Sequence, residues 1–562
     1  AFRIGLLSAV CGAVAVFALS RIAWRLAATF GASERLASAL ATTAGLVLMA
    51  SGAHLAESAR PEVYALNVAL VLLAFERALC FLETGLESHV RLGVVWLGLG
   101  LCNHHYLVAF AVPGLLAALA LRPDGRRLLL SPRLTSIALV GLSALALYAA
   151  LPIRSATNPV IDWGHPVSPA RLWDVITAKT FQSSVSSATR GAPLGENVAV
   201  ALGMWAESLG PIVLALGLFG LGWLAWTRRP LAALLGLGVL GSALSKAIMF
   251  IDPENPDDYG YFYTGIALCA ALSVVPLAAL AERLQRLGKA PWLLASVLLA
   301  ASGASALERF KRADRSADRS AEAMADALLA PLAPDAVAFV DYYQLYFATW
   351  YAQLVEGSRP DVDVVQASFD SKRYEGEPYL DALAARAPRL APIIESFRAL
   401  RRFPEAAVRT FAQGTPVYIE PTVDPLVPPE ESGRHGVLRR AFGADTPADR
   451  LAWDRLLRRA TTPTLGSDAS MVFDWTSFHA TLTALQQGEP SLAFAALTRW
   501  KLIGQAGPPD NLAQLVEGLF ARTRRGNRES GPDGPFLRLW AQTAVDGATE
   551  TTASAVLGHP SE

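Results

Sequence analysis

The feature that most constrains this chain is a series of long apolar segments confined to its first 307 residues. Only 37 of these 307 residues are charged, whereas 61 of the remaining 255 are. Soluble domains carry about 25% charged residues, so the second part has an ordinary soluble composition and the first part does not. The sequence therefore predicts a membrane-spanning part, residues 1–307, followed by a soluble part, residues 308–562.

Apolar segments of roughly 17–25 residues are long enough to cross a bilayer as a helix. Ten segments are predicted to cross, at 4–20, 36–54, 63–82, 91–103, 104–121, 135–152, 198–226, 231–251, 261–281 and 291–307. The stretch 91–121 carries Asn103, His104 and His105 in its middle, which favours two short helices that meet there over one long helix. The predicted fold class is a polytopic α-helical membrane bundle with about ten transmembrane helices, followed by the soluble part.

The distribution of Lys and Arg over the loops predicts the orientation of these segments, because cytoplasmic loops carry an excess of both. With strict alternation, the loops on one side hold 14 cations and the opposite loops hold five. A single crossing at 91–121 would remove this bias. Residues 308–562 are therefore predicted to lie outside the cytoplasm. The Ala-, Arg- and Leu-rich composition is typical of a GC-rich bacterium, which predicts the inner membrane with the soluble part on the periplasmic side.

The soluble part is predicted to begin with an α/β unit that extends to about residue 425. Short apolar runs at 336–341, 362–366 and 416–420 are typical of buried strands, and helical stretches such as 345–356 separate them. The remainder is predicted to be mostly helical, with helical hairpins such as the one across 476–502.

Composition excludes several classes of protein. The formal net charge is zero and no basic block is present, so the chain is not expected to bind nucleic acid. The apolar first part is inconsistent with a cytosolic enzyme or a disordered chain. All four cysteines lie in apolar runs, so neither a disulfide framework nor a thiolate zinc site is expected.

Unusual polar residues gather in the loops predicted to lie on the outer side, at 54–67, 103–106, 152–197 and 252–261. This mixture suits a lipid-linked sugar. Arginines neutralise a phosphate at the level of the headgroups, aromatic rings stack on sugars, and a carboxylate takes the proton of an acceptor hydroxyl. In the transfer of a sugar from a lipid phosphate, the leaving group is already a phosphate, so no strong acid is required to protonate it.

Simpler interpretations stay open for each of these features. Glu62 and Arg60 could form an interfacial ion pair that caps a helix. Lys246 could extend its ammonium to the interface without any further role, and Trp163 could be an interface anchor. What favours a site is that four separate loops place such groups on one side of one bundle.

Metal binding is not expected. His104 and His105 are adjacent, so their rings cannot share a helical face, and a metal would need partners from elsewhere. The acidic cluster at 252–258 could hold a divalent cation, but acidic loops are usually only solvated. The prediction is no cofactor and no metal.

The chain resembles the protein O-mannosyltransferase-like membrane family, also described as domain of unknown function 2723. The resemblance covers residues 59–362 in the order and spacing of that family. The matching strings are Ala59–Asn67, Asn103–His105, Tyr148–Ser155 with Asn158–Pro159 and Asp162–Gly164, Asp257–Phe262, and Trp350–Tyr351 with Gly357–Val362.

The resemblance implies a GT-C type glycosyltransferase, a polytopic bundle that uses a polyprenyl- or dolichyl-phosphate sugar on the non-cytoplasmic face. It also implies an acidic Asp-Ser-Gly-Glu-like motif in the first outer loop, which is not present here. The expectation is that this motif, with the catalytic Asp, lies upstream of Ala1. The catalytic residue is then unknown, with Glu62 and Asp162 as candidates that would organise the donor.

The predicted function is inverting transfer of a sugar, mannose by analogy, from a polyprenyl-phosphate-linked donor to an exported acceptor, a protein hydroxyl or a glycan, within the membrane lipid. The alternatives are a non-catalytic membrane scaffold and a lipid-linked-sugar transporter, which would show midplane charges and inverted repeats. The predicted donor- and acceptor-binding residues are Arg60, Tyr64, Asn67, Asn103, His104, His105, Arg154, Asn158, Trp163, Asp258 and Tyr261.

Overall fold

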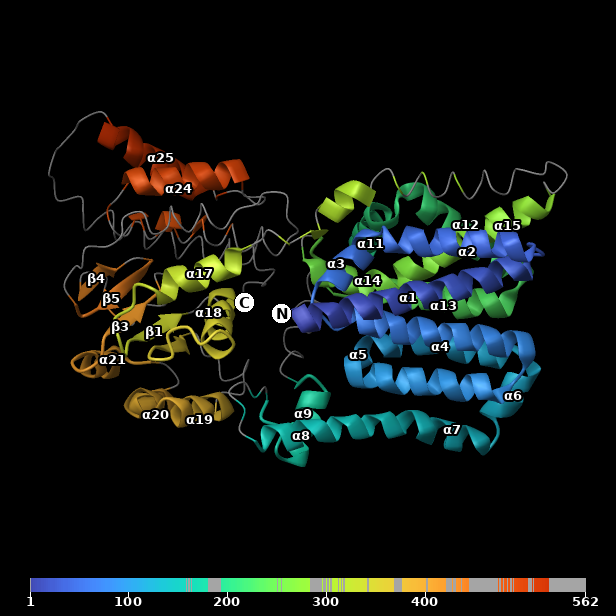
Figure 1. The fold of residues 1–562 in the computed structure, drawn as a ribbon, viewed down its shortest axis with the longest axis horizontal. Helices are drawn as coiled ribbons and strands as arrows, with labels where there is room; N and C mark the ends of the chain where they lie inside the picture. Colours follow the sequence, from blue (N-terminus) through green and yellow to red (C-terminus); the bar gives the residue numbers. More distant parts are fainter. Residues whose placement is uncertain are drawn as a thin grey trace. The chain divides into compact units, whose positions relative to one another are not determined.

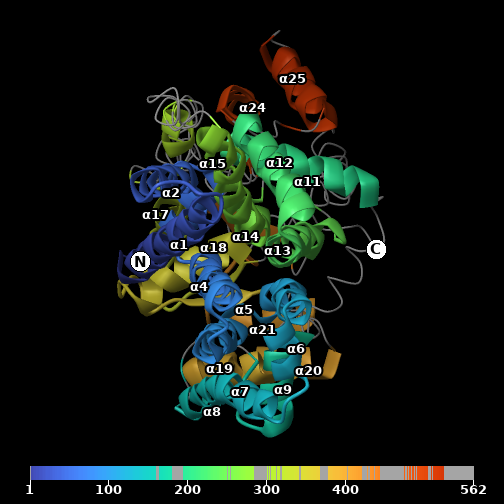
Figure 2. The same cartoon turned by 90° about the vertical axis from the view of Figure 1, so that its right-hand side faces the viewer.

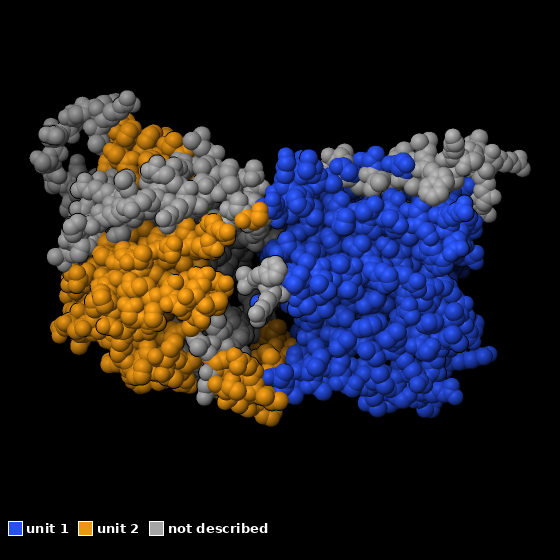
Figure 3. Space-filling model, viewed as in Figure 1, with its two compact units in different colours: residues 1–150, 184–314 blue, residues 151–183, 315–562 orange. Residues whose placement is uncertain are grey.

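A computed structural model describes residues 2–283, apart from 158, 160, 161, 163, 180–193, 250 and 254, and then shorter stretches between 296 and 524. Most of the predicted segment 291–307 lies outside the described residues, as do Asn158 and Trp163. The chain forms two compact units, residues 1–150 with 184–314 and residues 151–183 with 315–562 (Figure 3).

The first unit is a bundle of long apolar helices (Figure 1). Its helices are α1 (Phe2–Thr29), α2 (Glu34–Met49), α3 (Gly52–Ala59), α4 (Tyr64–Thr84), α5 (Glu87–Leu121), α6 (Pro123–Leu129), α7 (Arg133–Leu142), α11 (Leu194–Leu209), α12 (Pro211–Thr227), α13 (Arg229–Ala247), α14 (Pro256–Leu272) and α15 (Val274–Arg283). Among the described residues, six helices are long and apolar enough to cross a membrane, and two bent helix pairs raise the number to eight. These helices indicate an integral membrane protein.

Two of the predicted crossings are bent. The segment 198–226, predicted as one crossing, consists of two helices, α11 and α12, which meet at an angle of 113°. The break lies at Gly210, whose φ of 88° suits glycine, and Pro211 begins the next helix where its missing N–H costs nothing. The α2–α3 pair bends by 63°, and the Ser51 side chain caps α3 by accepting a hydrogen bond from the His54 N–H.

The chain reverses direction within α5. His104 has non-helical φ and ψ of −151° and 80°, so two helices meet there. A straight helix of 35 residues would be about 50 Å long, yet Arg122 at its far end donates a hydrogen bond to the carbonyl of Leu82, just before its start. The predicted division of 91–121 into two short helices is therefore confirmed.

Helix α14 lies at the centre of the first unit, among α1, α2, α12 and α13 (Figure 2). Every residue from Ile266 to Val275 is fully buried, which suits a helix that is apolar on all sides. Close packing depends on small residues: a Cβ at Gly217 of α12 would stand 2.5 Å from the carbonyl oxygen of Cys269. By contrast, Phe17, Phe219 and Trp226 are more than half exposed, as expected of side chains that face lipid.

The second unit contains a five-stranded sheet in the order β2-β1-β3-β5-β4. The strands are β1 (Val337–Val340), β2 (Asp363–Gln366), β3 (Val417–Ile419), β4 (Ser432–His435) and β5 (Leu438–Ala441). The first three are parallel and coincide with the predicted strands, whereas β5 pairs antiparallel with β3 and β4. The β4–β5 hairpin lies past residue 425, where mostly helix was predicted.

Helices cover both faces of this sheet, which explains why β1 is buried along its whole length. Ala338 and Val340 pack with α17 (Ser320–Leu329) and α18 (Tyr343–Leu354). Val337 and Phe339 point the other way, toward α19 (Glu377–Arg386), α20 (Ala391–Leu400) and α21 (Glu405–Ala412) (Figure 1). Beyond the sheet, α24 (Pro490–Ile503) and α25 (Asp510–Arg524) form a helical pair.

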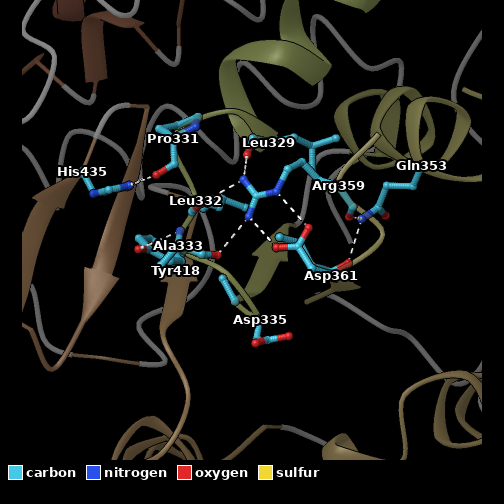
Figure 4. A network of polar contacts seen from close by, with 12 residues as sticks. Leu329, Pro331, Leu332, Ala333, Asp335, Gln353, Arg359, Asp361, Tyr418 and His435 are labelled. Atoms are coloured by element: carbon cyan, nitrogen blue, oxygen red, sulfur yellow. Dashed lines mark hydrogen bonds and ion pairs between the residues drawn. The ribbon is translucent and has the colours of Figure 1, made fainter. Parts of the chain in front are cut away.

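Arg359 ties the end of α17 to the sheet (Figure 4). Its guanidinium donates hydrogen bonds to the carbonyls of Leu329, Leu332 and Ala333 at 2.8, 2.9 and 3.0 Å. It also forms a bidentate pair with Asp361, at 2.9 Å from Nε and 2.8 Å from Nη2. The hydrogen bond from Arg359, together with its charge, lowers the pKa of Asp361 to about 2. In this structure, the string Gly357–Val362 therefore has a structural role.

Candidate functional site

The short helix α3 carries the first part of the candidate site. It begins after the bend at Ser51 and ends at Ala59, because Arg60 precedes Pro61 and has an extended backbone. Helical spacing turns His54 and Glu57 toward the bundle, where both are buried. The His54 Nδ1 and the Tyr263 hydroxyl of α14 are 2.5 Å apart, which ties α3 to the central helix.

Arg60 is surrounded by carboxylates. Its guanidinium donates to Asp257 at 2.8 Å and to Glu57 at 3.4 Å, and Glu62 stands 3.9 Å away. The side chain of Glu57 is fully buried, whereas those of Asp257 and Glu62 are 42% and 38% exposed. The predicted pair of Arg60 and Glu62 therefore exists, but it is longer than the contacts of Arg60 with Asp257 and Glu57. The enclosed Glu57 fixes the position of the guanidinium.

A second ion pair lies at the start of α14. Lys246, near the end of α13, is 2.9 Å from the carboxylate of Asp258, which is 1% exposed. The other carboxylate oxygen of Asp258 accepts a hydrogen bond of 2.7 Å from the backbone N–H of Asp252. Lys246 is thus the counter-ion of a buried carboxylate, so the interpretation of Lys246 as only an interfacial cation is wrong.

Aromatic rings lie beside these ion pairs. The ring of Tyr261 is 5.6 Å from that of Tyr64, 5.8 Å from that of His104 and 6.1 Å from that of Tyr106, measured between centroids. The Lys246 ammonium is 5.4 Å from the centroid of the Tyr261 ring, within the range of a cation–π interaction. A side chain at Gly260 would collide with the ring of Tyr64, so glycine permits this packing.

The reversal within α5 brings His104 to this cluster. Asn103 donates 2.8 Å to the carbonyl of Val63, and the Tyr106 hydroxyl donates 2.7 Å to the carbonyl of Ser245. These bonds anchor both sides of the turn. His104 then contacts Tyr64, whereas the neighbouring His105 is exposed, as their adjacent positions predicted. Asn67, one turn into α4, is fully buried.

A separate polar cluster lies in the second unit, between α8 (Ala150–Ser155) and α9 (Pro169–Ile176). The Asp162 carboxylate accepts a 2.6 Å hydrogen bond from the Ser155 hydroxyl and lies 2.6 Å from Nδ1 of His165. His165 has a positive φ of 41°, a strained conformation for a side chain with a Cβ. Arg154 is exposed and donates to the Thr157 hydroxyl at 3.3 Å.

The structure brings most of the predicted residues of the first unit together. Three of the four predicted outer loops meet at one end of the bundle, in ion pairs or ring contacts; the residues concerned are Arg60, Glu62, Tyr64, Asn103, His104, Asp258 and Tyr261. Arg154 and Asp162 belong to the other unit.

Three charged residues of the cluster were not among the predicted donor- and acceptor-binding residues: Glu57, Lys246 and Asp257. The spacing of Glu57 and Arg60, three residues apart on one helix, is the signal that could have identified Glu57. In the part of the chain that the structure describes, no three His, Cys, Asp or Glu side chains group as a metal would require.

Comparison with known proteins gives one match. Residues 1–127 match the family described as protein O-mannosyl-transferase TMEM260 N-terminal domain, and this stretch includes Arg60, Tyr64 and His104. No curated protein and no solved structure matches the chain. By this match, the first 127 residues are similar to the N-terminal domain of an O-mannosyltransferase family, the family whose motifs the sequence resembles.

Proposed function

We propose that this chain is an integral membrane glycosyltransferase of GT-C type, which transfers a mannose-like sugar from a polyprenyl-phosphate-linked donor to a hydroxyl of an exported protein. The observation that carries the proposal is the cluster of Arg60, Lys246, Tyr64, His104 and Tyr261 at one end of an apolar bundle. A bundle that served only as an anchor would not need buried ions there, because enclosing them is costly.

Arg60 would bind the donor phosphate. Its contact with Asp257 is partly exposed, and such ion pairs contribute little free energy, so a phosphate can replace this carboxylate. Glu57 stays enclosed and keeps the guanidinium oriented. Lys246 supplies a second cation on the same side.

The rings of Tyr64, His104 and Tyr261 would hold the sugar. Sugars present C–H faces that pack on aromatic rings, and the Asn103 side chain offers a hydrogen-bonding group beside them. Glu62 would organise the donor, and the group that takes the acceptor proton is unassigned. The second unit would help to select the acceptor.

The test uses the full-length protein in membrane vesicles, with a labelled polyprenyl-phosphate mannose as the donor and a Ser- and Thr-containing peptide as the acceptor. Arg60→Gln is expected to abolish transfer. Arg91→Gln is the matched control, because Arg91 pairs with Glu87 in an exposed i,i+4 contact on α5. Equal transfer by Arg60→Gln and Arg91→Gln would remove the assignment. Movement of intact donor across the vesicle membrane without transfer would favour a transporter instead.

A further inference from the structure

The first unit contains a second polar region, at the far ends of the helices that build the candidate site. The site lies at the start of α4 and the end of α13, whereas a cavity of about 340 Å³ lies at the end of α4 and the start of α13. Helix α4 has 21 residues, so roughly 30 Å separates the two regions. The cavity is therefore distinct from the candidate site.

Three arginines from three different parts of the chain line this cavity: Arg25 of α1, Arg122 after α5, and Arg228 before α13. Arg25 is held by Glu76, at 3.1 Å from its Nε, and by Glu83. Arg122 donates to the carbonyl of Leu82. Glu83 is the single carboxylate among the lining residues, so the described lining has an excess of positive charge.

Two guanidinium groups retain capacity to bind an anion. The Nε of Arg122 is enclosed and lies 3.5 Å from the Asp124 carboxylate, without a hydrogen-bond partner among the described residues. Arg228 is exposed, and no described carboxylate pairs with it. Helix α13 also begins at this rim, and the positive end of its dipole adds to the attraction. An anion bound here would accept hydrogen bonds from the guanidinium groups of Arg122 and Arg228.

The remaining walls of the cavity are apolar. Leu26, Leu79, Leu82, Leu121 and Leu231 line it, and Leu121 is 48% exposed at the surface. Because α4, α5 and α13 are candidate membrane spans, a cavity at their ends lies at the depth of lipid headgroups. Arginines above a leucine wall match a ligand with an anionic head and a hydrocarbon chain better than they match a free ion.

We propose that this cavity, which we name the arginine pocket after Arg25, Arg122 and Arg228, binds the phosphate headgroup of an anionic membrane phospholipid. The arginines bind the phosphate through charge-assisted hydrogen bonds, and the leucines contact the first part of an acyl chain. The positive-inside prediction places this end at the cytoplasmic leaflet, which is the leaflet rich in anionic lipids. The inference does not depend on the proposed sugar transfer.

The test measures thermal unfolding of the detergent-purified full chain and lipid retention in native mass spectrometry. The probes are phosphatidylglycerol, phosphatidylcholine and inorganic phosphate. The variant is Arg228→Gln, which removes an exposed cation of the pocket. Its control is Arg229→Gln, which removes the adjacent exposed cation that does not line the cavity.

Phosphatidylglycerol is expected to raise the unfolding temperature of the wild type and of Arg229→Gln. It is expected to bind Arg228→Gln about tenfold more weakly, because that variant loses one charge-assisted contact. Equal binding by the two variants, or an equal effect of phosphatidylcholine, would overturn the proposal. An equal effect of inorganic phosphate, lost in Arg228→Gln, would overturn the lipid assignment in favour of a free anion.

Discussion

Replacing Arg359 with Gln should loosen the sheet of the second unit at the connection between α17 and β1. The substitution removes three hydrogen bonds to main-chain carbonyls and the bidentate contact with Asp361. A hydrogen bond contributes about 1 kcal/mol net, and more when the donor is charged. The Arg359 side chain is 26% exposed, so water replaces part of what is lost. The expected cost is about 3 to 4 kcal/mol.

Hydrogen exchange of β1 amides reports this cost directly. The Val337 N–H, for example, is bonded to the Pro416 carbonyl across the sheet. A loss of about 3 to 4 kcal/mol should lower the protection of β1 by two to three orders of magnitude. The control is Arg398→Gln, since Arg398 pairs at the surface with Glu395 and Asp381. If both variants lower β1 protection equally, the assignment of Arg359 as a clamp is incorrect.

The same pair predicts a pH dependence. The folded pKa of Asp361 is about 2, below its unfolded value, because Arg359 favours the charged carboxylate. The pair therefore stabilises the folded state fully above about pH 5, and the contribution is lost as pH falls through the unfolded pKa toward 2. The penalty of Arg359→Gln should be smaller at pH 3 than at pH 6. An equal penalty at both values would contradict this sign.

Two other predictions concern the first unit. Gly217→Ala should destabilise it by about 1 to 3 kcal/mol, because the added Cβ meets a carbonyl of α14. The control is Gly222→Ala on the same helix, where a Cβ has open space. Thermal unfolding should show this control to be neutral or slightly stabilising. Lys246→Met should cost about 3 to 5 kcal/mol, because it leaves the buried Asp258 without its counter-ion. The double variant with Asp258→Asn should recover much of that loss, and a simple sum of the two single effects would argue against coupling.

The sequence could predict the elements whose pattern is local. The three parallel strands are short apolar runs, so their composition predicts them. The polar string Asn103–His105 interrupts an apolar stretch and so predicts the reversal within α5. The β4–β5 hairpin could not be found in this way, because Ser432–His435 and Leu438–Ala441 are largely polar and become strands by pairing with β3.

The candidate site shows the same division. Arg60 and Tyr64 could be selected because unusual polar and aromatic residues flank an apolar segment. The partnership of Lys246 with Asp258 could not, because the two residues lie on different helices and meet only after both helices pack. The break at Gly210 was missed because an apolar run continues on both sides of it.

The turn at His104 also affects the surrounding membrane. Each half of the 35-residue α5 has roughly 25 Å of helix, which is less than the ~30 Å thickness of the hydrocarbon layer. Local thinning of the bilayer is one way for a membrane to match so short a hairpin. Lipids near Tyr64 and Tyr261 would then carry their phosphates deeper than elsewhere, and the proposed lipid-linked donor would reach these rings without leaving its leaflet.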